Sequence, residues 1–65
     1  MSNSKLKMFV NNPELWESFT EEVNLYIVSC HKQMEQMRDT SDLFRLQGEV
    51  KALRKMISLR DKVNG

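Results

Sequence analysis

The chain has 65 residues, a formal net charge of +1 and a single cysteine. This length allows one domain at most, and one cysteine excludes an internal disulfide. The near-neutral charge argues against nucleic acid and anionic membranes as partners, because both call for a basic face. Single cores below roughly 70–80 residues rarely supply more than about 3–5 kcal/mol. We therefore expect oligomerisation, or docking on another protein, to complete the fold.

The chain has no segment that resembles a membrane span or an export signal. Its apolar runs fall far short of the roughly 18–20 residues that cross a bilayer. Residues 1–7 lack the apolar region and the small-residue cleavage site of a signal peptide. Together with the lone cysteine, these features predict folding in a reducing compartment inside a cell, without a membrane partner.

Residues 1–11 are predicted to form a flexible N-terminal arm. Leu6, Met8 and Val10 alternate as in a short extended segment, whereas Leu6, Phe9 and Val10 would share one face of a helix. Two roles remain open for the arm. Phe9 or Val10 can fold back over the rest of the domain, or the arm can insert into a neighbouring subunit with Phe9 at the interface.

The first long helix is predicted over about residues 13–38. Asn12 can cap its free amides, and Pro13 loses no hydrogen bond at the first helical position. Glu14 places negative charge near the positive end of the helix dipole. Apolar residues recur at steps of three and four along this segment, which gives the helix one apolar face. This face comprises Trp16, Phe19, Val23, Tyr26, Cys30 and Met34.

A second helix is predicted over about residues 42–63, after a turn at 39–41. The turn contains no glycine or proline, so Asp and Ser side chains must supply its local hydrogen bonds, with Thr40 or Ser41 as the helix cap. Asn64-Gly65 ends the helix. Its apolar face repeats at the same spacing and comprises Leu43, Leu46, Val50, Leu53 and Ile57.

These elements predict an all-α fold in which residues 12–65 form an antiparallel two-helix hairpin of the coiled-coil type. The short connection favours antiparallel neighbours, and the two apolar faces would pack on each other as the hairpin core. The acidic start of the first helix and the basic end of the second would then lie side by side. Because exposed ion pairs contribute only about 0–1 kcal/mol each, they select the orientation and add little stability.

The second helix has another row of apolar and small residues, which points away from the first helix. The row comprises Phe44, Gly48, Ala52, Met56 and Leu59. A helix with two apolar faces is usually buried on both, and a hairpin can bury only one. We therefore predict that this row, together with Phe9, forms a partner interface through which hairpins assemble into a helical bundle. The alternative is that Gly48 is a tolerated surface glycine, which costs about 1 kcal/mol in a helix.

The sequence has no pattern typical of an enzyme or a cofactor site. Cys30 and His31 are adjacent, so on a helix their side chains point about 100° apart and cannot act as nucleophile and base. Cys30 is expected to be a small buried hydrophobe, with a cross-subunit disulfide as the alternative. His31 and Glu35 have the spacing of two metal ligands, but no third ligand joins them. We predict no catalytic activity, no metal and no cofactor.

The segment 43–57 carries the pattern Arg45-x-Gln47-Gly48-x-x-x-Ala52-Leu53 followed by apolar residues. In this pattern the chain resembles the C-terminal half of small helical accessory proteins of tailed bacteriophages, whose genes tend to lie among packaging and head–tail genes. The resemblance covers about a third of the chain and implies a virus-encoded virion, assembly or packaging component. It implies a location in the host cytoplasm or in the virion, and it carries over no catalytic residue.

Three functions follow from these observations. The first is a non-enzymatic structural protein that associates with itself or with a larger protein assembly through its helices. The second is a small regulator that binds and inhibits a host protein, which requires a partner surface left open on a monomer or dimer. The third is a helical nucleic-acid binder, against which the near-neutral charge and the lack of aromatics among the basic residues argue.

Overall fold

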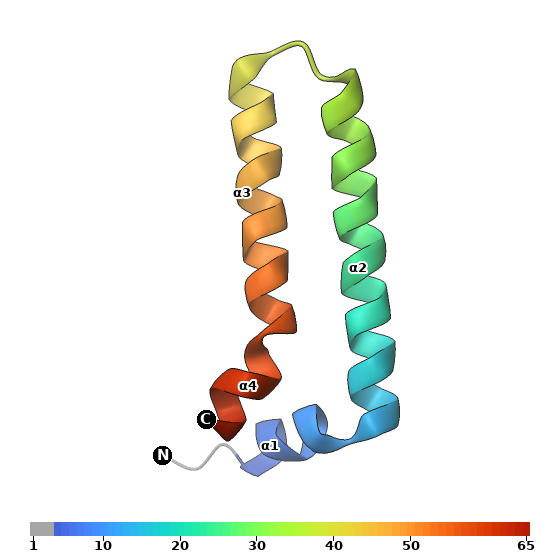
Figure 1. The fold of residues 1–65 in the computed structure, drawn as a ribbon, viewed down its shortest axis with the longest axis vertical. Coiled ribbons are helices and arrows are strands. Elements are labelled where there is room, and N and C mark those ends of the chain that lie inside the picture. Colours follow the sequence, from blue (N-terminus) through green and yellow to red (C-terminus); the bar gives the residue numbers. More distant parts are fainter. Residues whose placement is uncertain (1–3) are drawn as a thin grey trace.

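The computed structural model describes residues 4–65, and within them the structure is all-helical with no strand, which confirms the all-α class. The long helices α2 and α3 lie side by side and run in opposite directions, and the short helices α1 and α4 lie together at the end away from their connection (Figure 1). The molecule measures 44 × 24 × 14 Å. The elements are α1 (Ser4–Asn11), α2 (Pro13–Gln36), α3 (Thr40–Ile57) and α4 (Leu59–Asn64).

Helix α1 occupies the region where we predicted a flexible arm, and for residues 4–11 that prediction is wrong; residues 1–3 lie outside the described part. The segment is helical because its apolar residues at steps of three and four face α2 together. Val10 is 1% exposed. The Phe9 ring packs edge-on against Trp16 and Phe19, with ring centroids 5.7 Å and 5.3 Å away. This packing repays the ordering of a short helix that would not be stable alone.

Helix α2 begins as its sequence predicts. The Asn12 side chain accepts a hydrogen bond from the Leu15 amide at 3.0 Å, and Pro13 occupies the first helical position. The cap residue also joins α2 to α1, because the Asn12 amide donates to the Phe9 carbonyl at 3.2 Å. The chain therefore turns between α1 and α2 within one residue, without leaving these backbone groups unpaired.

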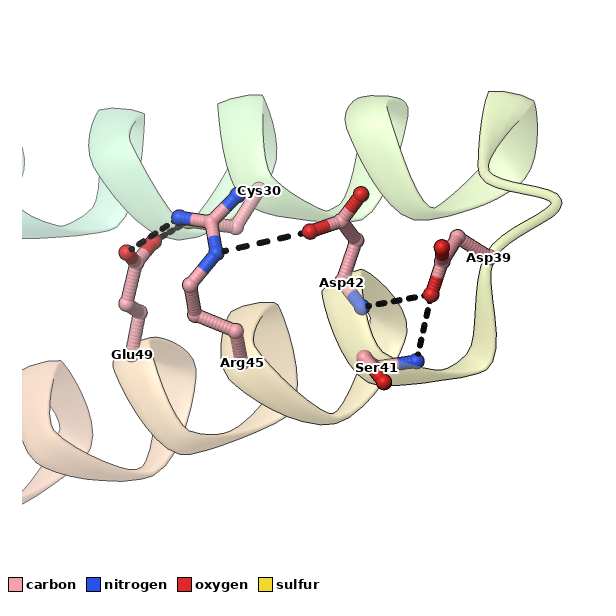
Figure 2. A network of polar contacts seen from close by, with 6 residues as sticks. All are labelled: Cys30, Asp39, Ser41, Asp42, Arg45 and Glu49. Carbon is pink, nitrogen blue, oxygen red and sulfur yellow. Dashed lines mark hydrogen bonds and ion pairs between the residues drawn. The ribbon is translucent and has the colours of Figure 1, made fainter.

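The connection between α2 and α3 differs from the prediction in three details. Helix α2 ends at Gln36, two residues before the expected end. Helix α3 begins at Thr40, two residues before the expected start, and its cap is Asp39 in place of Thr40 or Ser41. The Asp39 carboxylate accepts hydrogen bonds from the amides of Ser41 at 2.8 Å and Asp42 at 3.4 Å (Figure 2). An aspartate satisfies two amides and also adds negative charge at the helix N-terminus, so it is a stronger cap here than the hydroxyls that follow.

The second helix was predicted to continue to residue 63, but it breaks at Ser58. The Ser58 hydroxyl donates to the Lys55 carbonyl at 2.8 Å, a local bond that competes with regular helix geometry. Beyond the break, α4 lies against α1, and Asn11 and Asn64 exchange two amide hydrogen bonds of 2.8 Å and 3.1 Å. The break thus redirects the chain so that both ends of the described segment meet.

The core lies between α2 and α3 and consists of a short apolar cluster. Tyr26, which we placed in this core, is 59% exposed, and Ile27 is buried in its place at 7% exposure. The reason is angular: Val23, Ile27 and Cys30 follow one helical line at steps of four and three, from which Tyr26 is displaced toward solvent. The buried cluster is Val23, Ile27, Cys30, Leu46 and Val50, and the half-buried Phe19, Met34, Met37, Leu53 and Ile57 pack against it. Leu43 is also half-buried, and Trp16 is buried beside α1.

Candidate interaction surfaces

The chain leaves more surface exposed than a monomer of its mass usually does. Its accessible surface is 5418 Å², whereas a folded 7.7 kDa monomer is expected to expose about 4,300 Å². Its radius of gyration is 14.6 Å, against about 11 Å for a globular chain of this length. Two long helices packed along one line leave most of each helix uncovered. The surplus of about 1,100 Å² follows from this geometry.

The exposed apolar side chains concentrate on the two long helices. Six of the seven large exposed hydrophobic residues lie on α2 or α3, four on the first and two on the second, and each is about half exposed or more. They are Leu15, Leu25, Tyr26, Val28, Phe44 and Met56, with Met8 on α1. Single exposed hydrophobes are normal, so only those that lie together with other apolar groups mark a surface for binding.

The predicted interface row on α3 is only partly continuous. Phe44 is 65% exposed and Met56 51% exposed, and Ala52 between them is exposed as well. A methyl group placed on Gly48 would meet no atom within 4 Å, so the position is open to solvent. Leu59, however, lies beyond the break at the start of α4 and is half-buried. The row therefore ends at Met56.

Phe9, which we counted among the interface residues, does not belong to that surface. Its ring lies in a cluster with Trp16 and Phe19, and the side chain is half-buried within the chain itself. Arg60 covers the other side of this cluster, with its guanidinium carbon 6.0 Å from the Trp16 ring centroid. Residues from both ends of the described segment thus pack on this aromatic cluster, in which Trp16 is buried and Phe9 and Phe19 are half-buried.

An apolar groove runs between α2 and α3 on one side of the molecule. Tyr26 and Met56 form its exposed walls, and Cys30 and Leu53 lie at its base. Ala52 and Glu49 complete the lining. The sequence does not predict this surface as a unit, because it assigns Ala52 and Met56 to the outer row of α3 and Tyr26, Cys30 and Leu53 to the hairpin core. Only the pairing of α2 with α3 brings them together.

The opposite side of the same helix pair has a different character. The hollow there is lined by His31, Met34, Gln47, Val50, Lys51 and Arg54. Three of these side chains are basic or titratable and one is an amide, so this side suits water and ions better than an apolar partner. Cys30 and His31, although adjacent, therefore line opposite sides of the molecule and cannot act together.

A polar network beside the groove pairs Arg45 of α3 with two carboxylates of the same helix. Arg45 bonds Glu49 at 3.2 Å and approaches Asp42 at 3.9 Å (Figure 2). The Cys30 thiol lies 3.8 Å from the other oxygen of Glu49, within reach as a weak donor. Both ion pairs of residues 4–65 lie within α3. The expected attraction between the acidic start of α2 and the basic end of α3 thus forms no direct ion pair, and apolar packing holds the two helices together.

The described residues contain no cluster of three or more His, Cys, Asp or Glu side chains with the geometry to hold a metal ion. None of the helices in residues 4–65 combines the length and the apolar character needed to cross a membrane. Comparison of the chain with known protein families, with curated proteins and with solved structures gives no match.

Proposed function

We propose that this protein is a non-enzymatic interaction protein, an antiparallel helical hairpin that associates with itself into a larger helical bundle. The observation that supports this most strongly is the exposed surface, which exceeds that of a typical monomer by about 1,100 Å². A stable protein–protein interface buries about 800 Å² on each partner. A single interface of ordinary size would therefore remove most of the surplus.

The small buried core supports the same proposal. Only five residues form the central buried cluster, and none of the buried side chains of residues 4–65 is polar or charged. A core of this size contributes few kilocalories per mole, so association is the remaining way to stabilise so short a chain. Oligomerisation also covers exposed apolar side chains that would otherwise promote aggregation.

We further propose that the setting is a tailed bacteriophage, with the chain as an accessory component of the virion, of its assembly or of packaging, in the host cytoplasm or in the virion itself. The pattern from Arg45 to Leu53 supports this, because it resembles the C-terminal half of small helical accessory proteins of tailed bacteriophages.

The test is the mass of the full chain in solution, measured by light scattering over a wide concentration series. A dimer or a larger fixed species supports the proposal. A folded monomer at every concentration would contradict self-association and would leave the inhibitor of a host protein as the better account of the exposed apolar surface.

A further inference from the structure

We infer that the outward faces of α2 and α3 bind each other between copies of this chain, so that α2 of one copy packs on α3 of the next in a head-to-tail assembly of at least three chains. This inference rests on the proposed self-association and specifies its geometry. It keeps the surface of α3 that the sequence indicates and adds the surface of α2 that binds it.

The outward face of α2 has an exposed leucine at its centre. Leu25 lies two positions from both Val23 and Ile27 of the core, so its side chain points away from α3. It is 63% exposed and lies between two hollows, one lined by Glu21 and the other by Glu22. Exposed residues continue this line at alternating steps of four and three. The resulting surface, the α2 face, comprises Glu14, Ser18, Glu21, Leu25, Val28 and Lys32.

The outward face of α3 has small residues at its centre. Gly48 lies two positions from both Leu46 and Val50 of the core and therefore points away from α2. Together with Ala52, one turn further on, it forms a notch without bulky side chains, and an alanine at position 48 would keep this notch. The surface around the notch, the α3 face, comprises Phe44, Gly48, Lys51, Ala52 and Lys55, all of them exposed.

The charges on the two faces favour a second copy over an unrelated partner. The α2 face carries two carboxylates, and its one cation, Lys32, lies near the connection. The α3 face carries two lysines and no carboxylate, and the acidic residues of α3, Asp42 and Glu49, both pair with Arg45. No charged side chain of either face takes part in an ion pair of residues 4–65. Every copy therefore presents one unpaired face of each sign, and each face complements the other.

The register of the hairpin brings matching residues of the two faces together. Within the chain, Glu49 lies beside Cys30 and Arg60 beside Trp16, which fixes the levels of α3 and α4 along α2. When a second copy packs its α2 on α3 at these same levels, an apolar side chain meets the notch, a carboxylate meets an ammonium group and an ammonium group meets an aromatic ring. The pairs, with the residue of α2 first, are Leu25 with Ala52, Glu21 with Lys55, and Lys32 with Phe44.

The positions of the two faces set the minimum size of the assembly. Helices α2 and α3 lie side by side in a layer 14 Å thick, and the two faces point to opposite edges of this layer (Figure 1). Two copies can therefore join one α2 face to one α3 face, but they leave another face of each kind free. Such a head-to-tail contact adds further copies until the assembly closes on itself. We therefore expect at least three chains in the assembled species.

The experiment breaks one face at a time in the full chain and then mixes the two variants. Leu25→Lys places a cation on the α2 face, where it meets the lysines of the α3 face. The double variant Gly48→Gln, Ala52→Gln fills the notch of the α3 face with two neutral side chains. All three positions are exposed, so no core contact is lost, and circular dichroism checks that both variants remain helical.

Each variant alone is expected to be monomeric at concentrations where the wild-type chain assembles, because disruption of an interface centre should weaken the contact at least about 30-fold. The mixture is expected to form a one-to-one pair and nothing larger, since the intact α3 face of one variant binds the intact α2 face of the other. Sedimentation equilibrium measures both masses. Wild-type assembly by either variant alone, or a mixture that remains monomeric, would overturn the inference.

Tyr26→Lys is the matched control for Leu25→Lys. The two residues are adjacent and similarly exposed, but Tyr26 lines the groove beside Cys30 and lies off the α2 face. The control is expected to change the affinity by less than about threefold. A loss of assembly as large as that of Leu25→Lys would overturn the α2 face and would assign the contact to the groove.

The mass of the wild-type chain separates failure of this inference from failure of the proposed function. A species of three or more chains is the expected result. A wild-type dimer would overturn the head-to-tail arrangement and would leave the proposed self-association intact. A wild-type monomer at every concentration would contradict the proposed function itself and would assign both faces to other proteins.

Discussion

The two ends of the molecule are held by different kinds of interaction. At the α2–α3 connection, Asp39 caps α3 through amides two and three residues away. At the other end, Asn11 and Asn64 bond to each other across 53 positions of sequence, and Phe9 packs against residues of α2. The first end requires only local chain conformation, whereas the second exists only after α2 and α3 have paired. Substitutions at the α1–α4 end therefore test contacts between segments far apart in the sequence, and those at the connection test the start of one helix.

The largest effect is expected for Trp16→Ala at the α1–α4 end. Trp16 is 7% exposed and contacts both Phe9 and Phe19, so truncation removes the centre of the aromatic cluster. A loss of about 3–5 kcal/mol is comparable to the whole stability of so small a core, and we expect a largely unfolded chain by urea titration. Leu15→Ala, a change at an exposed neighbour, is the control and should shift stability by less than about 0.5 kcal/mol. An unchanged cooperative transition for Trp16→Ala would contradict the packing described at this end.

A smaller effect is expected for Asp39→Ala at the α2–α3 connection. Loss of the cap leaves two amides of α3 without their acceptor and should lower the free energy of unfolding by about 1 kcal/mol. Ser41→Ala is the matched control, because its hydroxyl makes no capping bond in the structure. Urea titration of both variants decides between the two caps. If Ser41→Ala lowers the free energy of unfolding more than Asp39→Ala does, Ser41 is the cap, as the sequence suggests, and Asp39 is not.

Between the two ends, Gly48→Ala is expected to stabilise the chain. The added methyl group meets no atom within 4 Å, and alanine is favoured over glycine in a helix by about 1 kcal/mol. The thermal midpoint of the variant should rise. A fall in the midpoint would contradict the open surroundings of Gly48 and would indicate that another molecule lies against it in solution.

The smallest effect is expected for Asn64→Ala, which removes the amide pair between α4 and α1. Both side chains are exposed, so the loss should be no more than about 0.5 kcal/mol. Backbone amide exchange gives the sharper measurement: protection should fall in α1 and α4 and remain in α2 and α3. A uniform fall along the chain would show that the two ends are not separable in stability. Asn11→Ala serves as the matched variant, with the same expected pattern.

The sequence predicts the start of the first long helix and most of the core residues, but not every residue that the helices bury against each other. Asn12 and Pro13 identify the start of α2 by themselves, because capping depends on residues within one helical turn. The spacing of Val23, Leu46 and Val50 places these residues in the core. The sequence places Tyr26 in the core, whereas the structure buries Ile27. A repeat of three and four residues fits either of these adjacent positions, and only the packing against α3 decides which one is buried.

The candidate interface shows the same division. The row from Phe44 to Met56 lies on one helix and is visible in the sequence, and the structure leaves most of it exposed. The Tyr26–Met56 groove combines residues of two helices, so its existence depends on their register. No local pattern specifies that register, because the connecting turn constrains only its own residues and the side chains of both helices decide how they settle against each other.

By itself the amino-acid sequence determined an all-α chain with two long amphipathic helices, a capped start to the first and a short turn between them, because helix periodicity and capping are local properties. The tertiary structure alone decided that residues 4–11 are helical, that the last helix breaks at Ser58, and that Phe9 is enclosed. Each of these depends on contacts between α1, α2 and α4, whose residues are brought together only when the chain closes on itself.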